Sequence, residues 1–188
     1  MLHPHPPGIL VGLMVETGMD PWMSSLSLEL IRSVLMTNGS LVLSHLDPVC
    51  REIQDKHQLD CSPNLAFGSV MTSQGLNIMD TPTQHRVERI SGLAASGCSR
   101  IILFKNGSEF IQGNPLVPTY AVRIDDGIEV ETEDSDLVLN PSCLDPRTAC
   151  ERVLEYCLGA GPQRKKPVSQ LFGNTDFQIT RGHLGISL

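Results

Sequence analysis

The sequence predicts an α/β fold, a three-layer sandwich with a mainly parallel sheet and helices on both faces. Short, continuous apolar runs, which are typical of strands buried on both faces, alternate with segments whose apolar residues recur at helical spacing. The connections between the first runs are short, and this order implies parallel pairing with a right-handed crossover. The composition agrees, since 40% of the 188 residues are hydrophobic and 19% are charged.

The first strand–helix–strand unit is the clearest part of the pattern. GILVGLMVE, residues 8–16, is an apolar run of the kind expected for a buried strand. The helix expected over 21–37 has an apolar stripe, begins after Asp20 as N-cap with proline in its first turn, and ends at an Asn-Gly pair. SLVLS, residues 40–44, is then the second buried strand.

The middle of the chain repeats this alternation. Asp47 precedes a proline and begins a polar helix that we expect to reach about residue 57, and 59–64 is a predicted loop. Residues 65–73 are a weak strand candidate, and LNIMD at 76–80 adjoins it. A second helical stripe over 83–96 ends at a glycine suited to a left-handed C-cap.

The last third of the chain holds three predicted strands and one helix. RIILF, residues 100–104, is the strongest strand signal, and TYAVRI follows at 119–124. The acidic stretch 125–136 is most simply a solvated turn before a strand over 136–140. Asp145 and the proline after it begin a helix that runs to Leu158.

This pattern predicts a single domain with two flanking segments. Residues 1–7 are an expected flexible N-terminus, 8–161 the α/β domain, and 162–188 a C-terminal extension packed on it. A net charge of −7 argues against a nucleic-acid surface. No apolar run approaches the roughly 20 residues that span a bilayer, and the first residues lack signal-peptide character. We therefore expect a cytoplasmic protein without a membrane partner.

The six cysteines do not form a CxxC pair, so a zinc ribbon or a thioredoxin-like motif has no support. Cys150 and Cys157 share a face of the last predicted helix. Buried thiols that act as small hydrophobic residues are the expected interpretation. Metal ligation remains the alternative.

Ligands of open parallel sheets bind beyond the carboxyl ends of the strands. That rule selects four loops in this chain, at 16–20, 44–48, 80–84 and 105–118. The turn Asp80-Thr81-Pro82 allows two compatible interpretations, a cap of the next helix or a ligand contact.

The loops also contain candidate catalytic groups. His45 and His85 lie in two of these regions, and either is a candidate general base because imidazole titrates near neutral pH, although a loop histidine is usually only solvated. In the loop 105–118, Gly107 and Gly113 permit unusual backbone angles or a close approach of ligand. This loop lacks both GxGxxG and the GKS/GKT ending of a phosphate loop, so nucleotide binding is disfavoured.

Four stretches together resemble the C-terminal half of the altronate/galactarate dehydratase family. They are GLNIMDTP (75–82), ERISGLAASGCSRIILF (88–104), the segment 12–44, and GNTDFQITRGHLG (173–185). Members of that family are cytosolic lyases that remove water from hexonate or hexarate sugar acids. The resemblance implies a hydroxy-acid ligand, abstraction of the proton α to a carboxylate, and loss of the β-hydroxyl.

The resemblance also implies site residues, a cofactor and partners. The implied site consists of catalytic His45, Asp80 and Lys105, and of substrate-binding Thr81, Asn106, Gly107, Ser108, Gly113 and Asn114. Several family members depend on a divalent metal, commonly iron, so Fe²⁺, Mn²⁺ or Mg²⁺ is the expected cofactor. A shortened domain exposes former contact surfaces, which implies self-association or a partner subunit.

Several polar residues of the family are replaced in this chain. The family's Cys-Gly-Gly-Ser-Asp loop falls on residues 15–19, and its glutamate after the second strand becomes His45. Its Thr-Thr-Gly-Arg-Gly loop becomes residues 105–109, and a lysine becomes Ala121. These replacements support a second hypothesis, a catalytically silent member that binds a ligand or a protein surface.

Overall fold

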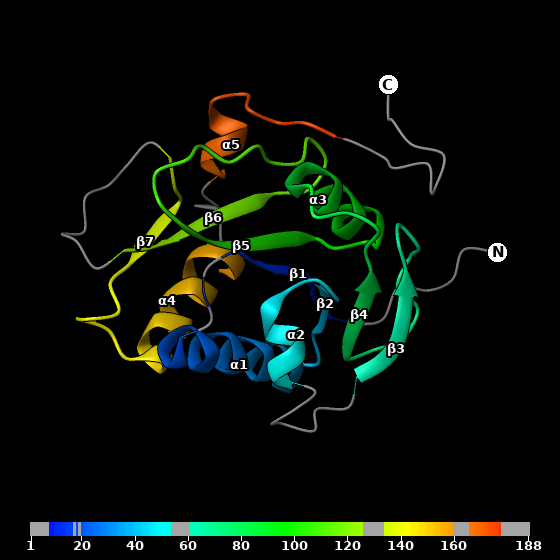
Figure 1. Cartoon of the computed structure of the whole chain (residues 1–188), viewed down its shortest axis with the longest axis horizontal. Helices are drawn as coiled ribbons and strands as arrows, with labels where there is room; N and C mark the ends of the chain where they lie inside the picture. Colours follow the sequence, from blue (N-terminus) through cyan, green and yellow to red (C-terminus); the bar gives the residue numbers. More distant parts are fainter. Residues whose placement is uncertain are drawn as a thin grey trace.

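The computed structural model describes residues 8–16, 18, 20–53, 61–125, 134–159 and 166–177, with only the backbone for 61–64. The elements in chain order are β1 Leu10–Val15, α1 Pro21–Met36, β2 Ser40–Ser44, α2 Pro48–Glu52, β3 Cys61–Ala66, β4 Leu76–Asp80, α3 Arg86–Ala95, β5 Arg100–Asn106, β6 Thr119–Ile124, β7 Leu137–Leu139, α4 Pro146–Leu158 and α5 Val168–Leu171 (Figure 1). None of the described helices is long and apolar enough to cross a membrane.

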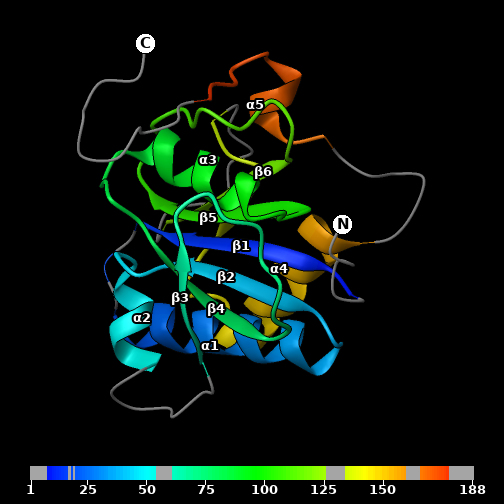
Figure 2. The same ribbon diagram turned by 90° about the vertical axis from the view of Figure 1, so that its right-hand side faces the viewer.

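The seven strands in the described part of the chain form one sheet in the order β3-β4-β2-β1-β5-β6-β7, and every neighbouring pair is parallel. Helices α1, α2 and α4 cover one face, and α3 and α5 lie on the other (Figures 1 and 2). The predicted α/β sandwich is therefore confirmed, with a sheet that is wholly rather than mainly parallel.

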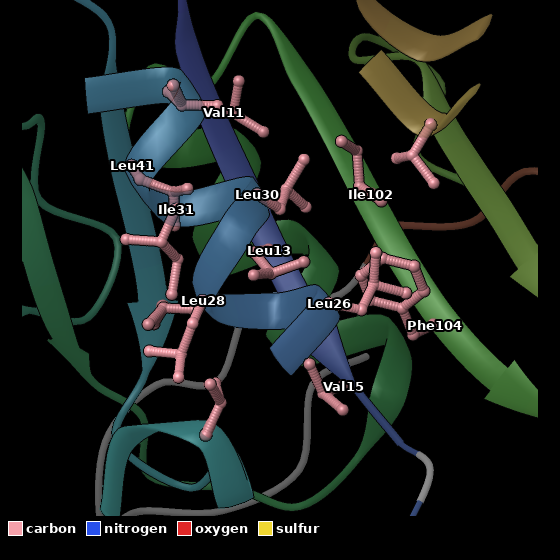
Figure 3. Close-up of a cluster of buried hydrophobic side chains, with 14 of the residues drawn as sticks. Val11, Leu13, Val15, Leu26, Leu28, Leu30, Ile31, Leu41, Ile102 and Phe104 are labelled. Carbon is pink, nitrogen blue, oxygen red and sulfur yellow. The ribbon is translucent and has the colours of Figure 1, made fainter. Parts of the chain in front are cut away.

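The central strand β1 shows why its sequence is a continuous apolar run. Val11, Leu13 and Val15 pack into the core beneath α1, whereas Leu10 and Met14 pack into the core beneath α3. Figure 3 shows the first of these cores, with α1 lying across β1 and its neighbouring strands. Both faces of the strand are covered, so alternation between apolar and polar residues is absent.

The predicted helix ends are confirmed at several positions. The carboxylate of Asp20 accepts from the amide of Met23 at 2.7 Å, and that of Asp145 accepts from the amides of Arg147 and Thr148. Asn38 follows the C-cap residue Thr37 of α1 and has a φ of 56°, the left-handed conformation that commonly ends a helix. These local signals locate the ends of α1 and the start of α4.

One predicted element between β2 and β4 differs from the structure, and the end of another lies outside the described residues. Helix α2 is described over Pro48–Glu52, and its expected end near residue 57 falls within 54–60, outside the described residues. The loop predicted over 59–64 is wrong, because Cys61–Ala66 form strand β3. This strand lies at the sheet edge, where a proline such as Pro63 is tolerated because one side of the strand has no ladder to complete. Pairing with β4, rather than local propensity, produces it.

The start of the helix predicted over 83–96 also differs. Helix α3 begins at Arg86, and His85 is its N-cap without a side-chain cap bond. Asp80 belongs to β4, and Pro82 favours an extended conformation for the residue before it. The interpretation of Asp80-Thr81-Pro82 as the helix cap is therefore wrong.

Four described cysteines are buried free thiols, as predicted, whereas Cys143 is exposed. Burial raises the pKa of Cys98 to about 12 and that of Cys150 to about 11. At neutral pH these thiols are protonated and act as small apolar side chains.

Asp136 joins the C-terminal segment to the sheet. Its carboxylate accepts from the amide of Ala121 on β6 and from the amide of Val168 at the start of α5, each at 2.7 Å. Farther along, Gly113 pairs with Thr175. The described part of the expected extension, 166–177, thus contacts the domain, and the expected flexible segment 1–7 lies outside the described residues.

We expect Asp136 to make stability fall as the pH rises. Burial raises its pKa from 3.8 to about 6, so the folded chain retains a proton that the unfolded chain has lost between these values. The wild type should therefore lose up to about 3 kcal/mol relative to Asp136→Asn between pH 4 and pH 7. Urea denaturation of both proteins at each pH measures this difference.

Asp145 provides the matched control, because its bonds to Thr148 hold its pKa below 3.8. The stability difference between wild type and Asp145→Asn should stay level or rise over the same pH range. A difference for Asp136→Asn that also stays level would contradict the assignment of a raised pKa.

Candidate functional site

The carboxyl ends of the parallel strands meet at one edge of the sheet, and the chain reverses its strand order between β1 and β5. Ligands of such sheets bind beyond this point. We call the residues at this edge the rim: Glu16, His45, Asp80, Thr81, Arg86 and Glu109.

A buried carboxylate fixes the base of the rim. The side chain of Asp47 accepts from the amides of Val15 and Ser44, each at 3.0 Å, and from the guanidinium of Arg89 at 2.5 Å. It therefore ties the ends of β1 and β2 to helix α3. Burial raises the pKa of Asp47, while Arg89 and the two amides oppose this shift. All three contacts come from hydrogen-bond donors, which suits the ionised form of Asp47.

Sequence patterns did not identify this anchor. Asp47 is the N-cap of α2 by position, yet its side chain makes no cap bond and turns toward the strands instead. Arg89 lies between the buried residues Val87 and Ile90 on α3 and is itself buried. An arginine within an apolar helical stripe is the signal that predicts a buried ion pair.

His45, Asp80 and Thr81 lie together, as expected for residues at the ends of neighbouring strands. The Nδ1 atom of His45 accepts from the amide of Thr81 at 3.0 Å and lies 3.5 Å from a carboxylate oxygen of Asp80. Because Nδ1 is an acceptor, the proton of the neutral ring is on Nε2. Protonation of Nδ1 would exchange the bond to Thr81 for an ion pair with Asp80.

A second cluster crosses the rim from β1 to the loop after β5. Arg86, at the start of α3, contacts both carboxylate oxygens of Glu16 at 2.7–3.0 Å and reaches Glu109 at 3.4 Å. The hydrogen bond with Glu16 raises the pKa of Arg86 above its ordinary value. Among the described residues, Nη1 of Arg86 has no partner, which leaves one edge of the guanidinium available to an anion.

The loop 105–118 divides into two parts at opposite ends of the sheet. Asn106, Gly107 and Ser108 are exposed at the carboxyl edge, and Gly107 has a φ of 75°. The side chain of Lys105 is buried, and its ammonium donates to the carbonyl of Glu109 at 2.5 Å and lies 3.1 Å from the carboxylate of Asp134. These contacts favour a role in holding negative charge over proton abstraction.

Gly113 and Asn114 lie away from the rim. Asn114 donates its amide to Thr119, the first residue of β6, and its side-chain oxygen accepts from two amides of its own turn. A Cβ on Gly113 would lie 2.2 Å from Oγ of Ser169. The six residues of β6 separate the two edges of the sheet by about 16 Å. The structure therefore brings the two residues to the C-terminal segment and not to His45.

The described rim does not fit the divalent metal that the resemblance implies. No group of three or more His, Cys, Asp or Glu side chains that could hold a metal occurs among the described residues. His45 and Asp80 are two candidate donors, and the lone pair of Nδ1 is already used by Thr81. We therefore route no step of the chemistry through a metal.

Comparisons of the chain with protein-family models, curated protein sequences and solved structures give no match.

Proposed function

We propose that the protein is a dehydratase-like carbon–oxygen lyase domain of the cytoplasm that removes water from a hydroxy acid of the hexonate or hexarate type. The observation that supports this proposal is the contact of His45 with the amide of Thr81 beside Asp80. It assembles a histidine, a carboxylate and the turn that resembles the altronate/galactarate dehydratase motif.

Elimination of water needs a base for the α-proton, a hydrogen-bond donor for the departing hydroxyl and a positive charge for the carboxylate. Asp80 is the base, because its carboxylate is exposed and, within the described part of the chain, contacts His45 alone. The Nε2–H of His45 donates to the β-hydroxyl, and Nη1 of Arg86 binds the carboxylate.

In this scheme Asp80 takes the proton, and the electron pair of the C–H bond forms the double bond. The hydroxyl leaves as water with a proton from solvent, and the resulting enol becomes a 2-keto acid. The free edge of Arg86 serves one carboxylate, so a hexarate needs a further cation from this chain or from another subunit. The proposal includes self-association or a partner chain as one source of that cation.

The test is incubation of the full chain with a panel of hexonates and hexarates, with and without Fe²⁺, Mn²⁺ or Mg²⁺. A 2-keto acid is the expected product, measured as its semicarbazone. Absence of product with every substrate, metal and copurifying partner would reject the lyase proposal.

A catalytically silent, ligand-binding module is the second candidate. It is favoured by the pairing of the cations near the rim: Arg86 with Glu16, Arg89 with Asp47, and Lys105 with Asp134. Binding of a hydroxy acid without turnover would support this candidate. Turnover that survives dialysis and is lost in Asp80→Ala would contradict it.

A further inference from the structure

Two cationic side chains lie on adjacent strands near the carboxyl end of the sheet. Lys105 on β5 and Arg123 on β6 are register partners in parallel strands. Their side chains are only 2% and 8% exposed. Like charges on adjacent strands repel each other, and burial strengthens this repulsion. We call these two side chains the basic pair, and its stability requires an anion.

The carboxylate of Asp134 meets this requirement. One of its oxygens lies 3.1 Å from Nζ of Lys105, and the other lies 3.5 Å from Nη1 of Arg123. Each oxygen of this one carboxylate thus contacts a different cation. A ligand of the basic pair therefore needs two oxygens arranged as in a carboxylate.

The basic pair has donor capacity that Asp134 does not use. The Nε atom of Arg123 is buried without a hydrogen-bond partner, although an oxygen of Asp125 lies 3.4 Å away. A buried donor without a partner costs free energy that a better-placed acceptor would recover. The side chain of Asp134 is 13% exposed, so its position borders solvent.

We propose that Lys105 and Arg123 form a binding site for the carboxylate of a small molecule. Asp134 occupies this site within the chain, and an external carboxylate displaces it. The ligand is small because the basic pair is almost completely buried. The proposal does not depend on the lyase activity.

The site adjoins the rim through Glu109. The carbonyl oxygen of this residue accepts from Lys105, while its side chain contacts Arg86. A carboxylate bound at the basic pair is therefore linked through one residue to the free guanidinium edge of the rim.

The experiment removes the internal carboxylate and supplies an external one. We expect Asp134→Ala to melt at a lower temperature than the wild type, and sodium acetate or formate to restore its melting temperature saturably. Sodium chloride at equal ionic strength should restore it less, because a chloride ion does not reproduce the two separate oxygens that contact Lys105 and Arg123. Equal effects of acetate and chloride would overturn the proposal.

A direct measurement keeps the proposal testable if Asp134→Ala is poorly stable. In NMR titrations with ¹³C-acetate, Asp134→Ala should bind at least about tenfold more tightly than the wild type, because an internal occupant lowers the fraction of competent sites. The double variant Lys105→Met/Asp134→Ala removes one cation with the anion, so it should fold yet lose acetate binding. Acetate binding retained by the double variant, or no gain in Asp134→Ala, would contradict the assignment.

Discussion

Replacement of Asp47 by alanine is expected to lower the free energy of unfolding by about 3–5 kcal/mol, because it leaves the buried guanidinium of Arg89 without its counter-ion. It also removes the acceptor of the amides of Val15 and Ser44. Urea denaturation followed by far-UV circular dichroism measures the loss. The nearby variant Asp80→Asn is the control, since this side chain is 73% exposed and should change stability by less than about 0.5 kcal/mol.

The double variant Asp47→Asn/Arg89→Met separates the ion pair from the surrounding packing. Loss of both charges avoids an unpaired buried charge, so the double variant should be more stable than Asp47→Ala. A cost for Asp47→Ala below about 1 kcal/mol would show that water or another group reaches Arg89.

The elements that the sequence predicted well are those whose signal is local. RIILF forms a strand because a run with apolar side chains on both faces suits only the middle of a covered sheet. Asp20 and Asp145 cap helices through bonds within their own turns. Strand β3 contains Pro63 and depends on its neighbour β4, so no local pattern identifies it.

The same distinction applies to the candidate site. Parallel strands bring their carboxyl ends to one edge, which is why the loops that hold His45 and Asp80 could be assigned to one site from the sequence. The partners of Arg86 and Arg123 depend on the direction of each side chain, which the spacing of residues along the sequence does not determine. Gly113 was grouped with the rim because it shares a loop with Lys105, yet a loop between parallel neighbours must return to the amino edge.

Asp80→Asn is expected to reduce the turnover of a hydroxy-acid substrate by about 10²–10⁴-fold, because the amide cannot accept the α-proton. The bond between His45 and the amide of Thr81 does not involve this carboxylate, so the histidine should keep its position. Initial rates of 2-keto acid formation measure the loss, and the stability comparison above tests whether the fold is retained.

Glu88→Gln is the matched control. Glu88 carries a carboxylate, as Asp80 does, but it lies in the first turn of α3 and has no place in the proposed scheme. It should retain wild-type turnover. Turnover retained in Asp80→Asn would assign the base to another residue.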